Sequence, residues 1–395
     1  MSDEVTSVAE MTTRRPSWAW RLAGMALRLL VPVAITALAA ALGYAYAVYP
    51  LWYHIDQIRK TATLGTLLTA ASARKNLLGA YSEDTGLDRN LAAFDDVIWS
   101  VPTVMTPFVG YGAAPGQQHN AYINRYQFRG QREPTMPKPP GVTRIFLTGA
   151  SVAFSAGAPD DERTIGAYLQ SLLDRRSAET GRRYEVFTFA TNAWSSTHER
   201  IAIENRVSEL DPDLVLELTG VADCLYGERG LNVLWARALT DQYYWDLVNI
   251  ALKRSGFAPM VDVQDVSPGR VPPEVVAVRL QKNVRLAAGA LALANARLHV
   301  FLQPAIATTG KPLSPREKRL LSLFGSLMNT GYNQDAYRRI AELLGGGGLP
   351  PNASFTDLSG LFDAMPETPE VFLDFYHFGD RGNLMIAQRM ADVIR

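Results

Sequence analysis

The sequence has almost no cysteine and no excess of charge of either sign. Its one cysteine, Cys224, cannot form an internal disulfide, and no cysteine–histidine spacing resembles a zinc site. Lys plus Arg and Asp plus Glu number 39 each, so nothing indicates the concentrated basic surface that nucleic-acid binding needs. The glycine run 345–348 lacks the Gly-Lys-Ser/Thr ending of a phosphate loop. We therefore expect no cofactor, no metal and no nucleic-acid partner.

Charge is also missing from a long apolar run near the N-terminus. No charged residue occurs from Leu29 to Tyr53, and these 25 residues, at about 1.5 Å rise each, can cross a hydrocarbon core of about 30 Å. A segment inside a bilayer must satisfy its own backbone hydrogen bonds, so a single spanning helix is expected. The flanking basic residues are Arg14, Arg15, Arg21 and Arg28 before the run, and Arg59 and Lys60 after it. This bias predicts a cytoplasmic N-terminus and a main domain outside the membrane.

A cleaved signal peptide is the alternative to a membrane anchor. Ala37-Leu38-Ala39 resembles a small-x-small cleavage site, but the apolar run continues well past it, which favours the anchor. The expected location is a bacterial inner membrane, crossed once, with the main domain in the periplasm. The expected parts are a cytoplasmic tail (1–28), a transmembrane helix (29–53), an extracytoplasmic linker and lead-in (54–140) and a main domain (141–395).

Strands and helices are expected to alternate after residue 140. Short apolar runs with β-branched residues predict five strands, at 143–148, 184–190, 214–219, 299–303 and 355–358. Apolar residues at helical spacing predict helices at 164–179, 195–210, 275–297, 315–344 and 380–394. This alternation predicts a three-layer α/β/α fold with a central parallel sheet. In such sheets the chemistry lies at the carboxyl ends of the strands.

Residues 225–274 fit this alternation poorly and are predicted to form an insertion. The insertion holds an aromatic cluster, Trp235, Tyr243, Tyr244 and Trp245. The cluster either forms a small local core, which is the commoner arrangement, or stacks on sugar rings.

Ser151 follows the first predicted strand on a turn made of small residues. A serine on a tight strand-to-helix turn exposes its hydroxyl and turns its own N–H towards the site, which suits a nucleophile. Serine is common in turns for other reasons, so this position needs partners before it indicates catalysis.

Asp374 and His377 supply such partners just before the last predicted helix. A short turn between them brings the carboxylate to one imidazole nitrogen, while the other faces a serine, as a Ser–His–Asp relay requires. The same spacing also occurs where an aspartate caps a helix and the histidine lies on the surface.

Together these segments resemble the SGNH (GDSL-type) serine esterase and acyltransferase family, over residues 120–395. That family has a serine after its first strand and Asp-x-x-His before its last helix. The resemblance implies a flavodoxin-like α/β/α fold and a catalytic triad of Ser151, Asp374 and His377. Further segments follow in the family's order: INRYQFRG at 123–130, PKPPGVTRIFLTGAS at 137–151, DPDLV at 211–215, KPLS at 311–314 and HFGDRGN at 377–383.

The departures from the family pattern concern the groups that hold the oxyanion. The glycine that offers its N–H corresponds best to Ala190, with Asn192 or Ala193 as alternatives. In the Gly-x-Asn-Asp block, Ala222 replaces the asparagine whose amide would be the third donor. Asn192, at the end of the neighbouring strand, offers a substitute amide.

Two other residues of that block, Gly220 and Asp223, are also expected at the oxyanion or substrate site. For Asp223 a structural role, as a helix cap or a brace for the site loops, is the commoner alternative. The segment at 123–130, upstream of the first strand, also departs from the family pattern, because Gln127 replaces a glycine.

The resemblance implies an enzyme that forms an acyl-Ser151 intermediate. Water as acceptor makes it an esterase, and a sugar hydroxyl makes it an O-acyltransferase. Outward-facing anchored members resemble proteins that add or remove acetyl groups on cell-surface polysaccharides. The expected substrate is therefore an acylated carbohydrate or other ester, and the expected partner a membrane-embedded acyl donor or an envelope complex. The alternative, suggested by Ala222, is an inactive SGNH-like domain that binds glycan or serves as a scaffold. A nucleotide-binding protein is disfavoured because no glycine-rich fingerprint follows the first strand.

Overall fold

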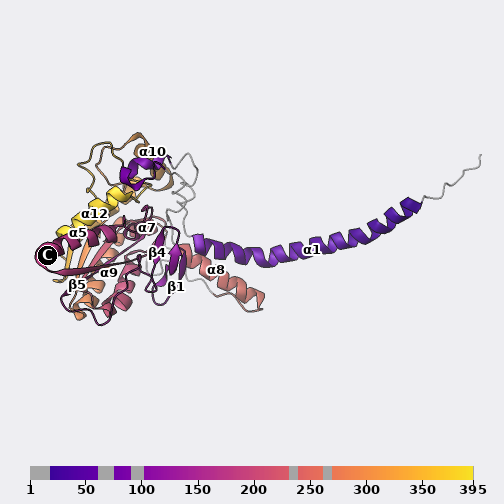
Figure 1. Ribbon diagram of the computed structural model, residues 1–395, viewed down its shortest axis with the longest axis horizontal. Helices are drawn as coiled ribbons and strands as arrows, with labels where there is room; N and C mark the ends of the chain where they lie inside the picture. The colour runs from indigo at the N-terminus through magenta and orange to yellow at the C-terminus, as the bar shows by residue number, and fades with distance from the viewer. Residues whose placement is uncertain (1–17, 61–74, 90–101, 231–238, 261–268, 395) are drawn as a thin grey trace, which may run out of the picture. The chain divides into compact units, whose positions relative to one another are not determined.

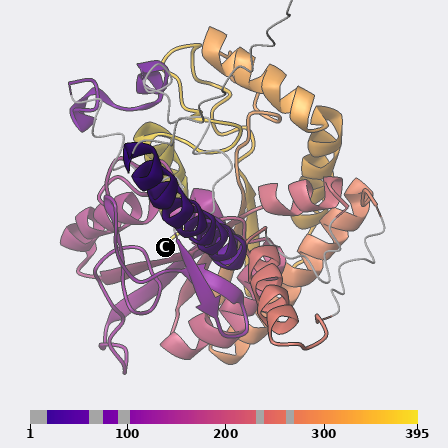
Figure 2. The same cartoon turned by 90° about the vertical axis from the view of Figure 1, so that its right-hand side faces the viewer.

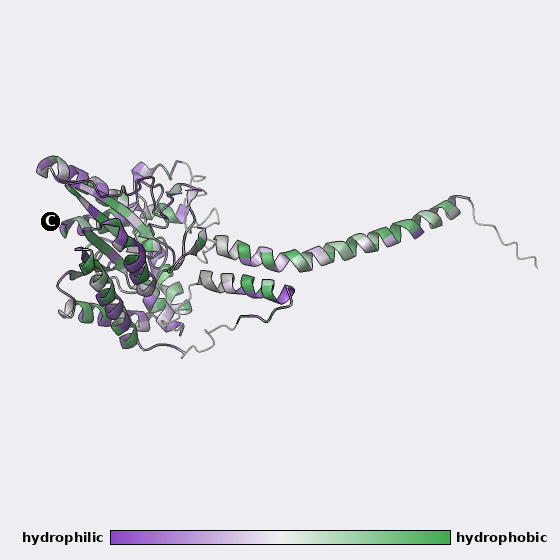
Figure 3. Cartoon of the chain, turned by 90° about the horizontal axis from the view of Figure 1, so that it is seen from below, coloured by the Kyte–Doolittle hydropathy of each residue, from purple (hydrophilic) through white to green (hydrophobic). Residues whose placement is uncertain are grey.

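The computed structural model describes residues 18–60, 75–89, 102–230, 239–260 and 269–394. It divides into two units, Met1–His54 and Ile55–Arg395. Helix α1 (Trp18–Lys60) accounts for the described part of the first unit. Within it, Met25–Ile55 is the one segment of the described residues long and apolar enough to cross a membrane, and Figure 3 shows its hydrophobic colouring. The predicted span 29–53 lies inside this segment; a signal sequence near the N-terminus also meets this criterion of length and composition.

The second unit is built around a five-stranded parallel sheet. The strand order is β6-β5-β7-β8-β9, and every neighbouring pair is parallel. In chain order this is 2-1-3-4-5, the order of flavodoxin-like doubly wound sheets, so the predicted fold class is confirmed. The bounds are β5 Val142–Gly149, β6 Arg183–Ala190, β7 Leu214–Thr219, β8 Arg297–Leu302 and β9 Ala353–Asp357.

Helices cover both faces of this sheet because its strands carry apolar residues on both sides. Leu147 faces a core that includes Leu169 of α5 (Ile165–Thr180) and Ile386 of α12 (Asp380–Asp392). Its neighbour Phe146 faces a second core, with Val284 of α9 (Pro273–Leu293) and Ile340 of α11 (Thr330–Gly345). Figure 1 shows α5 and α12 on one side of the sheet and α9 on the other.

The predicted single helix over 315–344 is wrong. The chain forms α10 (Pro315–Leu327) and α11 instead, separated by Met328 in an extended conformation. The Asn329 side chain accepts the N–H of Tyr332 at 2.8 Å and thereby caps α11. The predicted helix 195–210 is also subdivided: α6 (Ser196–Ala202) continues as a π-helical turn, Ile203–Val207, and a 3₁₀ turn, Ser208–Leu210.

The loop-rich lead-in folds into two hairpins. One pairs β1 (Thr103–Thr106) with β2 (Gly110–Ala113), and the other pairs β3 (Gly116–Gln118) with β4 (Ala121–Ile123). Tyr111 and Phe128 of this region lie in the second core. Figure 2 shows the β1–β2 hairpin, in purple, beside α8, which contacts β2. The domain boundary at residue 141 stays a prediction.

The predicted insertion contains the end of α7 (Val221–Glu228) and all of α8 (Leu239–Arg254). Trp235 and the side chains of Tyr243 and Tyr244 lie outside the described residues, while Trp245 is half-buried. The aromatic cluster therefore stays a prediction. Short 3₁₀ turns also occur at Leu78–Ala80 and Glu83–Thr85.

Candidate active site

Ser151 begins the short helix α4 (Ser151–Phe154) directly after β5. Gly149 makes the sharp turn possible: its φ is 151°, and a side chain there would collide with the carbonyl oxygen of Leu218. The connections from β5 and β6 lead to opposite sides of the sheet, so Ser151 lies at the topological switch point, where open α/β sheets bind ligands.

His377 reaches Ser151 from a tight turn near the C-terminus. Its Nε2 lies 2.7 Å from Ser151 Oγ, and its Nδ1 lies 2.6 Å from Asp374 Oδ2. The other carboxylate oxygen of Asp374 accepts the backbone N–H groups of Tyr376 at 3.0 Å and His377 at 2.9 Å. The side chains of all three predicted triad residues are buried, and the structure brings them together in one hydrogen-bonded chain.

The environment of Asp374 favours its ionised form. Burial raises the pKa of this carboxyl, but the neighbouring His377 charge and the hydrogen bonds from His377 and Tyr376 outweigh burial and lower it overall. An ionised Asp374 accepts the Nδ1–H of His377, which leaves the Nε2 lone pair directed at the serine hydroxyl. This is the tautomer that a general base next to a serine needs.

A buried ion pair supports the segment that carries Asp374. Lys311 Nζ lies 2.8 Å from Glu317 Oε2, and both side chains are completely buried. The second carboxylate oxygen of Glu317 accepts the N–H groups of Val371 at 3.0 Å and Phe372 at 3.3 Å. Sequence reasoning missed the role of Glu317, because Val371 and Phe372, the backbone groups that it holds, lie more than fifty residues away along the chain.

Part of the predicted linker also supports the histidine turn. Leu77 and Tyr81 form a small cluster with Leu373, next to Asp374. Gly379 packs so closely that a side chain there would collide with the carbonyl of Ala80. The spacing of Leu77 and Tyr81, four residues apart, is the sequence signal that could have identified this support.

The loop after β6 offers the best oxyanion donor. Thr191 donates its N–H to Gly149 O at 3.3 Å, so the N–H of Ala190, one residue earlier in the strand, points away from β5 and Ser151. Ala193 has a left-handed φ of 62°, and its N–H has no hydrogen-bond partner among the described residues. Its carbonyl is held by Tyr226 Oη at 2.6 Å. Of the three alternatives from the sequence, the geometry therefore favours Ala193 over Ala190.

Asn192, the predicted substitute amide, is buried in the same loop. Its side-chain Oδ1 has no hydrogen-bond partner among the described residues. Its backbone carbonyl accepts the Tyr111 hydroxyl at 3.0 Å. This bond fixes the backbone of Asn192 and does not involve its side-chain amide. The same amide carries two N–H groups, so Asn192 is able to offer a donor as well as an acceptor.

Gly220 and Asp223 occupy the end of β7 and the start of α7. Gly220 caps α7 with a φ of 119°, and a side chain there would clash with Leu302. Asp223 is buried and accepts the N–H of Ser196 at 2.9 Å and its hydroxyl at 2.6 Å. It thereby ties α7 to the start of α6. A part for either residue in substrate binding stays a prediction.

Two further carboxyls are buried on the α6 and α9 side of the sheet. Glu217 of β7 and Glu199 of α6 are completely buried, and their carboxyls lie close enough to share a hydrogen bond when one of them is protonated. Burial raises the pKa of Glu217 to about 7. The pKa of Glu199 is also raised, first by burial and then by the charges of Glu217 and Asp223. No group of three or more acidic, histidine or cysteine residues suited to a metal occurs among the described residues.

No protein-family model matches the chain, and no curated protein matches it in sequence. Solved structures of similar fold include the acetyl xylan esterase AlAXEase, with 15% identity over 64% of this chain and 100% of that chain, at a TM-score of 0.39. A putative lipolytic protein of the G-D-S-L family from Desulfitobacterium hafniense has 11% identity over 64% and 99%, at 0.38. Axe2, an acetylxylan esterase from Geobacillus stearothermophilus, has 13% identity over 63% and 93%, at 0.35. TM-scores this low leave the family and the activity to be argued from the site itself.

Proposed function

We propose that the chain is an SGNH-type serine esterase or O-acyltransferase, anchored in a bacterial inner membrane with its main domain in the periplasm. Its proposed substrates are acetyl esters of cell-envelope or exported polysaccharide, and its intermediate an acyl group on Ser151. The observation that carries this proposal is the unbroken chain from Ser151 Oγ through His377 to Asp374, with distances of 2.7 and 2.6 Å.

In the first half of the reaction, Ser151 Oγ attacks the ester carbonyl carbon while its proton passes to His377 Nε2. Asp374 stabilises the resulting imidazolium through the Nδ1 hydrogen bond. The protonated histidine then gives its proton to the leaving alcohol oxygen as the carbon–oxygen bond of the ester breaks. The acyl group remains bound to Ser151.

The negative charge that forms on the carbonyl oxygen needs donors on the side opposite His377. The N–H of Ser151 is the first of α4 and has no partner within that helix. The free N–H of Ala193 is a second donor and the Asn192 amide a third, in place of the asparagine that Ala222 replaces. This arrangement makes activity compatible with Ala222.

The second half of the reaction distinguishes the two activities. His377 takes a proton from the acceptor, which attacks the acyl-serine carbonyl, and Ser151 leaves with a proton from the histidine. A water molecule gives a free acid, and a sugar hydroxyl gives a new ester. A membrane-embedded acyl donor is the partner that the second outcome requires.

The alternative is an inactive glycan-binding or scaffold subunit, and Ala222 is the feature that favours it. A scaffold has no need of a buried serine hydrogen-bonded to a histidine and a carboxylate, so the triad geometry favours the enzyme.

The test uses the full chain in detergent, a fluorophosphonate probe and a chromogenic acetyl ester, beside the Ser151→Ala variant. We expect labelling and ester cleavage in the wild type and neither in the variant. A folded wild-type protein that is not labelled by the probe has no working nucleophile, which would contradict the proposal. Addition of oligosaccharides and mass analysis of the products then separates transfer from hydrolysis.

A further inference from the structure

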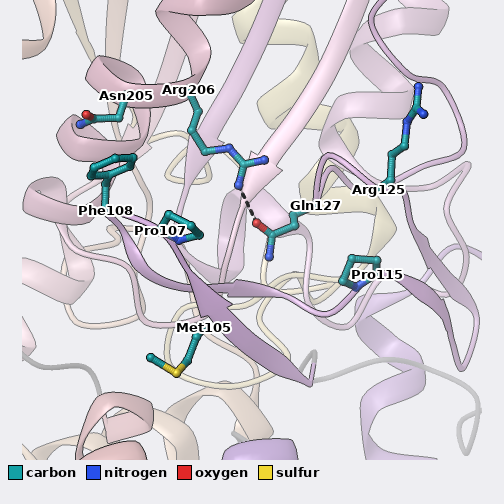
Figure 4. Close-up of a pocket in the computed structure, with 8 residues that line it drawn as sticks. All are labelled: Met105, Pro107, Phe108, Pro115, Arg125, Gln127, Asn205 and Arg206. Atoms are coloured by element: carbon teal, nitrogen blue, oxygen red, sulfur yellow. Dashed lines mark hydrogen bonds between the residues drawn. The ribbon is translucent and has the colours of Figure 1, made fainter.

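A pocket of about 400 Å³ lies between the β1–β2 hairpin and the π-helical turn after α6. Figure 4 shows its lining, which mixes apolar and polar side chains. The lining residues are Met105, Pro107, Phe108, Pro115, Arg125, Gln127, Asn205 and Arg206. None of the eight is acidic, and nothing in the proposed reaction uses them.

Arg206 carries a positive charge into this pocket without a carboxylate to balance it. Of the five N–H groups of its guanidinium, one donates to Gln127 Oε1 at 2.6 Å and one to Tyr126 O at 3.3 Å, which leaves three. No described carboxylate lies within ion-pair distance of it. Burial lowers its pKa, and no acidic neighbour offsets this effect. A half-buried guanidinium in this state is a binding group for an anion.

The guanidinium is fixed in position by its neighbours. Gln127, the residue that departs from the family's glycine, has a left-handed φ of 66° and is buried. Its amide nitrogen donates to Thr106 Oγ1 at 2.9 Å and to Ala113 O at 3.1 Å, both in the β1–β2 hairpin. The Arg206 guanidinium stacks on Phe189, 5.0 Å from the ring centre. Figure 4 shows it pointing at Gln127. The anion-binding group is therefore preorganised, which reduces the entropy lost on binding.

The rim of the pocket suits a flat, hydroxylated ligand. The Phe108 side chain is 77% exposed, and Pro107 lies next to it, so an aromatic and an aliphatic surface face the solvent beside the charge. Asn205 adds an exposed amide whose oxygen accepts hydroxyl donors. Arg125 lies at the rim but is already paired with Glu133 at 2.7 Å. Apolar faces with a few oriented polar groups are typical of small-molecule sites.

We propose that this pocket binds an acidic sugar unit, with the Arg206 guanidinium on its carboxylate and the Phe108 ring against its apolar face. The pocket is an accessory site, separate from Ser151. The β1–β2 hairpin that lines the pocket also contacts the loop after β6. The Tyr111 hydroxyl donates to Asn192 O at 3.0 Å, and the Tyr111 carbonyl accepts the Nε1–H of Trp194 at 3.1 Å. A polysaccharide held in the pocket would thus lie on a rigid element that also supports the catalytic loop.

The experiment measures binding of trigalacturonate and of its uncharged counterpart, α-1,4-linked galactotriose, to the full chain in detergent, by calorimetry. We expect trigalacturonate to bind, galactotriose to bind at least about tenfold more weakly, and added salt to weaken the difference. Arg206→Gln is expected to weaken trigalacturonate binding by about tenfold or more. The matched control Arg182→Gln removes an exposed arginine outside the pocket and leaves binding unchanged.

Thermal unfolding of each variant checks that it is folded, independently of any catalytic activity. Arg206 also donates to the backbone carbonyl of Tyr126, so a second variant, Phe108→Ser, is needed. The Phe108 side chain is exposed, so we expect this variant to fold while binding weakens. Equal binding of both trisaccharides, or unchanged binding in both folded variants, overturns the proposal. Tighter binding of glycerol phosphate than of trigalacturonate also overturns it, and assigns the pocket to a phosphate ester.

Discussion

His377 Nε2 lies 2.7 Å from Ser151 Oγ, although 226 residues separate them along the chain. The two residues lie on segments that are distant in sequence: Ser151 follows β5, and His377 lies in the turn before α12. A hydrogen bond between groups so far apart in sequence, and both buried, requires that the whole sheet and the last helix be in place. Activity should therefore be lost together with global unfolding.

Replacement of Asp374 by asparagine tests the role of its charge. The amide cannot hold the Nδ1–H tautomer of His377, so we expect the turnover number for a chromogenic acetyl ester to fall by about 1,000- to 10,000-fold. The Michaelis constant is expected to change little. Asp392→Asn, at an exposed carboxylate, is the control. A fall of less than tenfold in folded Asp374→Asn protein would count against a triad.

The oxyanion assignment is tested by a pair of substitutions. Asn192→Ala is expected to lower turnover by about 100- to 1,000-fold, if its amide replaces the missing donor. Ala222→Asn restores the family's asparagine and is expected to recover most of that loss in the double variant. The measurement is the turnover number of the two single variants and the double variant. Unchanged turnover in Asn192→Ala removes Asn192 from the site.

The strands and the proximity of Asp374 to His377 could be predicted because their signals are local, whereas the pairing of Ser151 with His377, 226 residues away, was predicted from the resemblance to the SGNH family. Each strand is a short apolar run, and Asp374 and His377 lie within one turn of each other. The break at Met328 was missed because helical spacing continues through it, and the Asn329 cap is recognisable only once the break is known. The support from Glu317 was missed because it depends on contacts between distant segments, which no local pattern encodes.

The Lys311–Glu317 pair is expected to matter for stability and for the catalytic turn. Glu317→Ala leaves a buried ammonium without its partner, which typically costs about 3–5 kcal/mol. It also frees the N–H groups of Val371 and Phe372. We expect a lower denaturant midpoint and reduced turnover even where the protein is folded. Glu342→Ala, at an exposed position, should leave both unchanged.

The N-terminal helix gives a prediction about processing. If Met25–Ile55 is an anchor, the mature protein retains residues before Ala39, and alkaline carbonate does not extract it from membranes. Intact mass of the purified protein and carbonate extraction are the two measurements. A mature chain that begins just after Ala39 and is released in soluble form identifies a signal peptide, and the anchor must then be abandoned.

Glu217 predicts how stability depends on pH. Its folded pKa of about 7 lies above the ordinary value of 4.5, so its contribution to stability is full below the ordinary value and is lost as the pH rises through 7. The loss at high pH is on the order of 3 kcal/mol. Glu217→Gln cannot ionise, so its melting temperature should fall less between pH 4 and pH 8 than that of the wild type. Glu209→Gln, at an exposed glutamate, should follow the wild type. Parallel melting curves for wild type and Glu217→Gln across this range would mean that the folded pKa of the Glu217 carboxyl is not raised, because a counter-charge or water compensates for its burial.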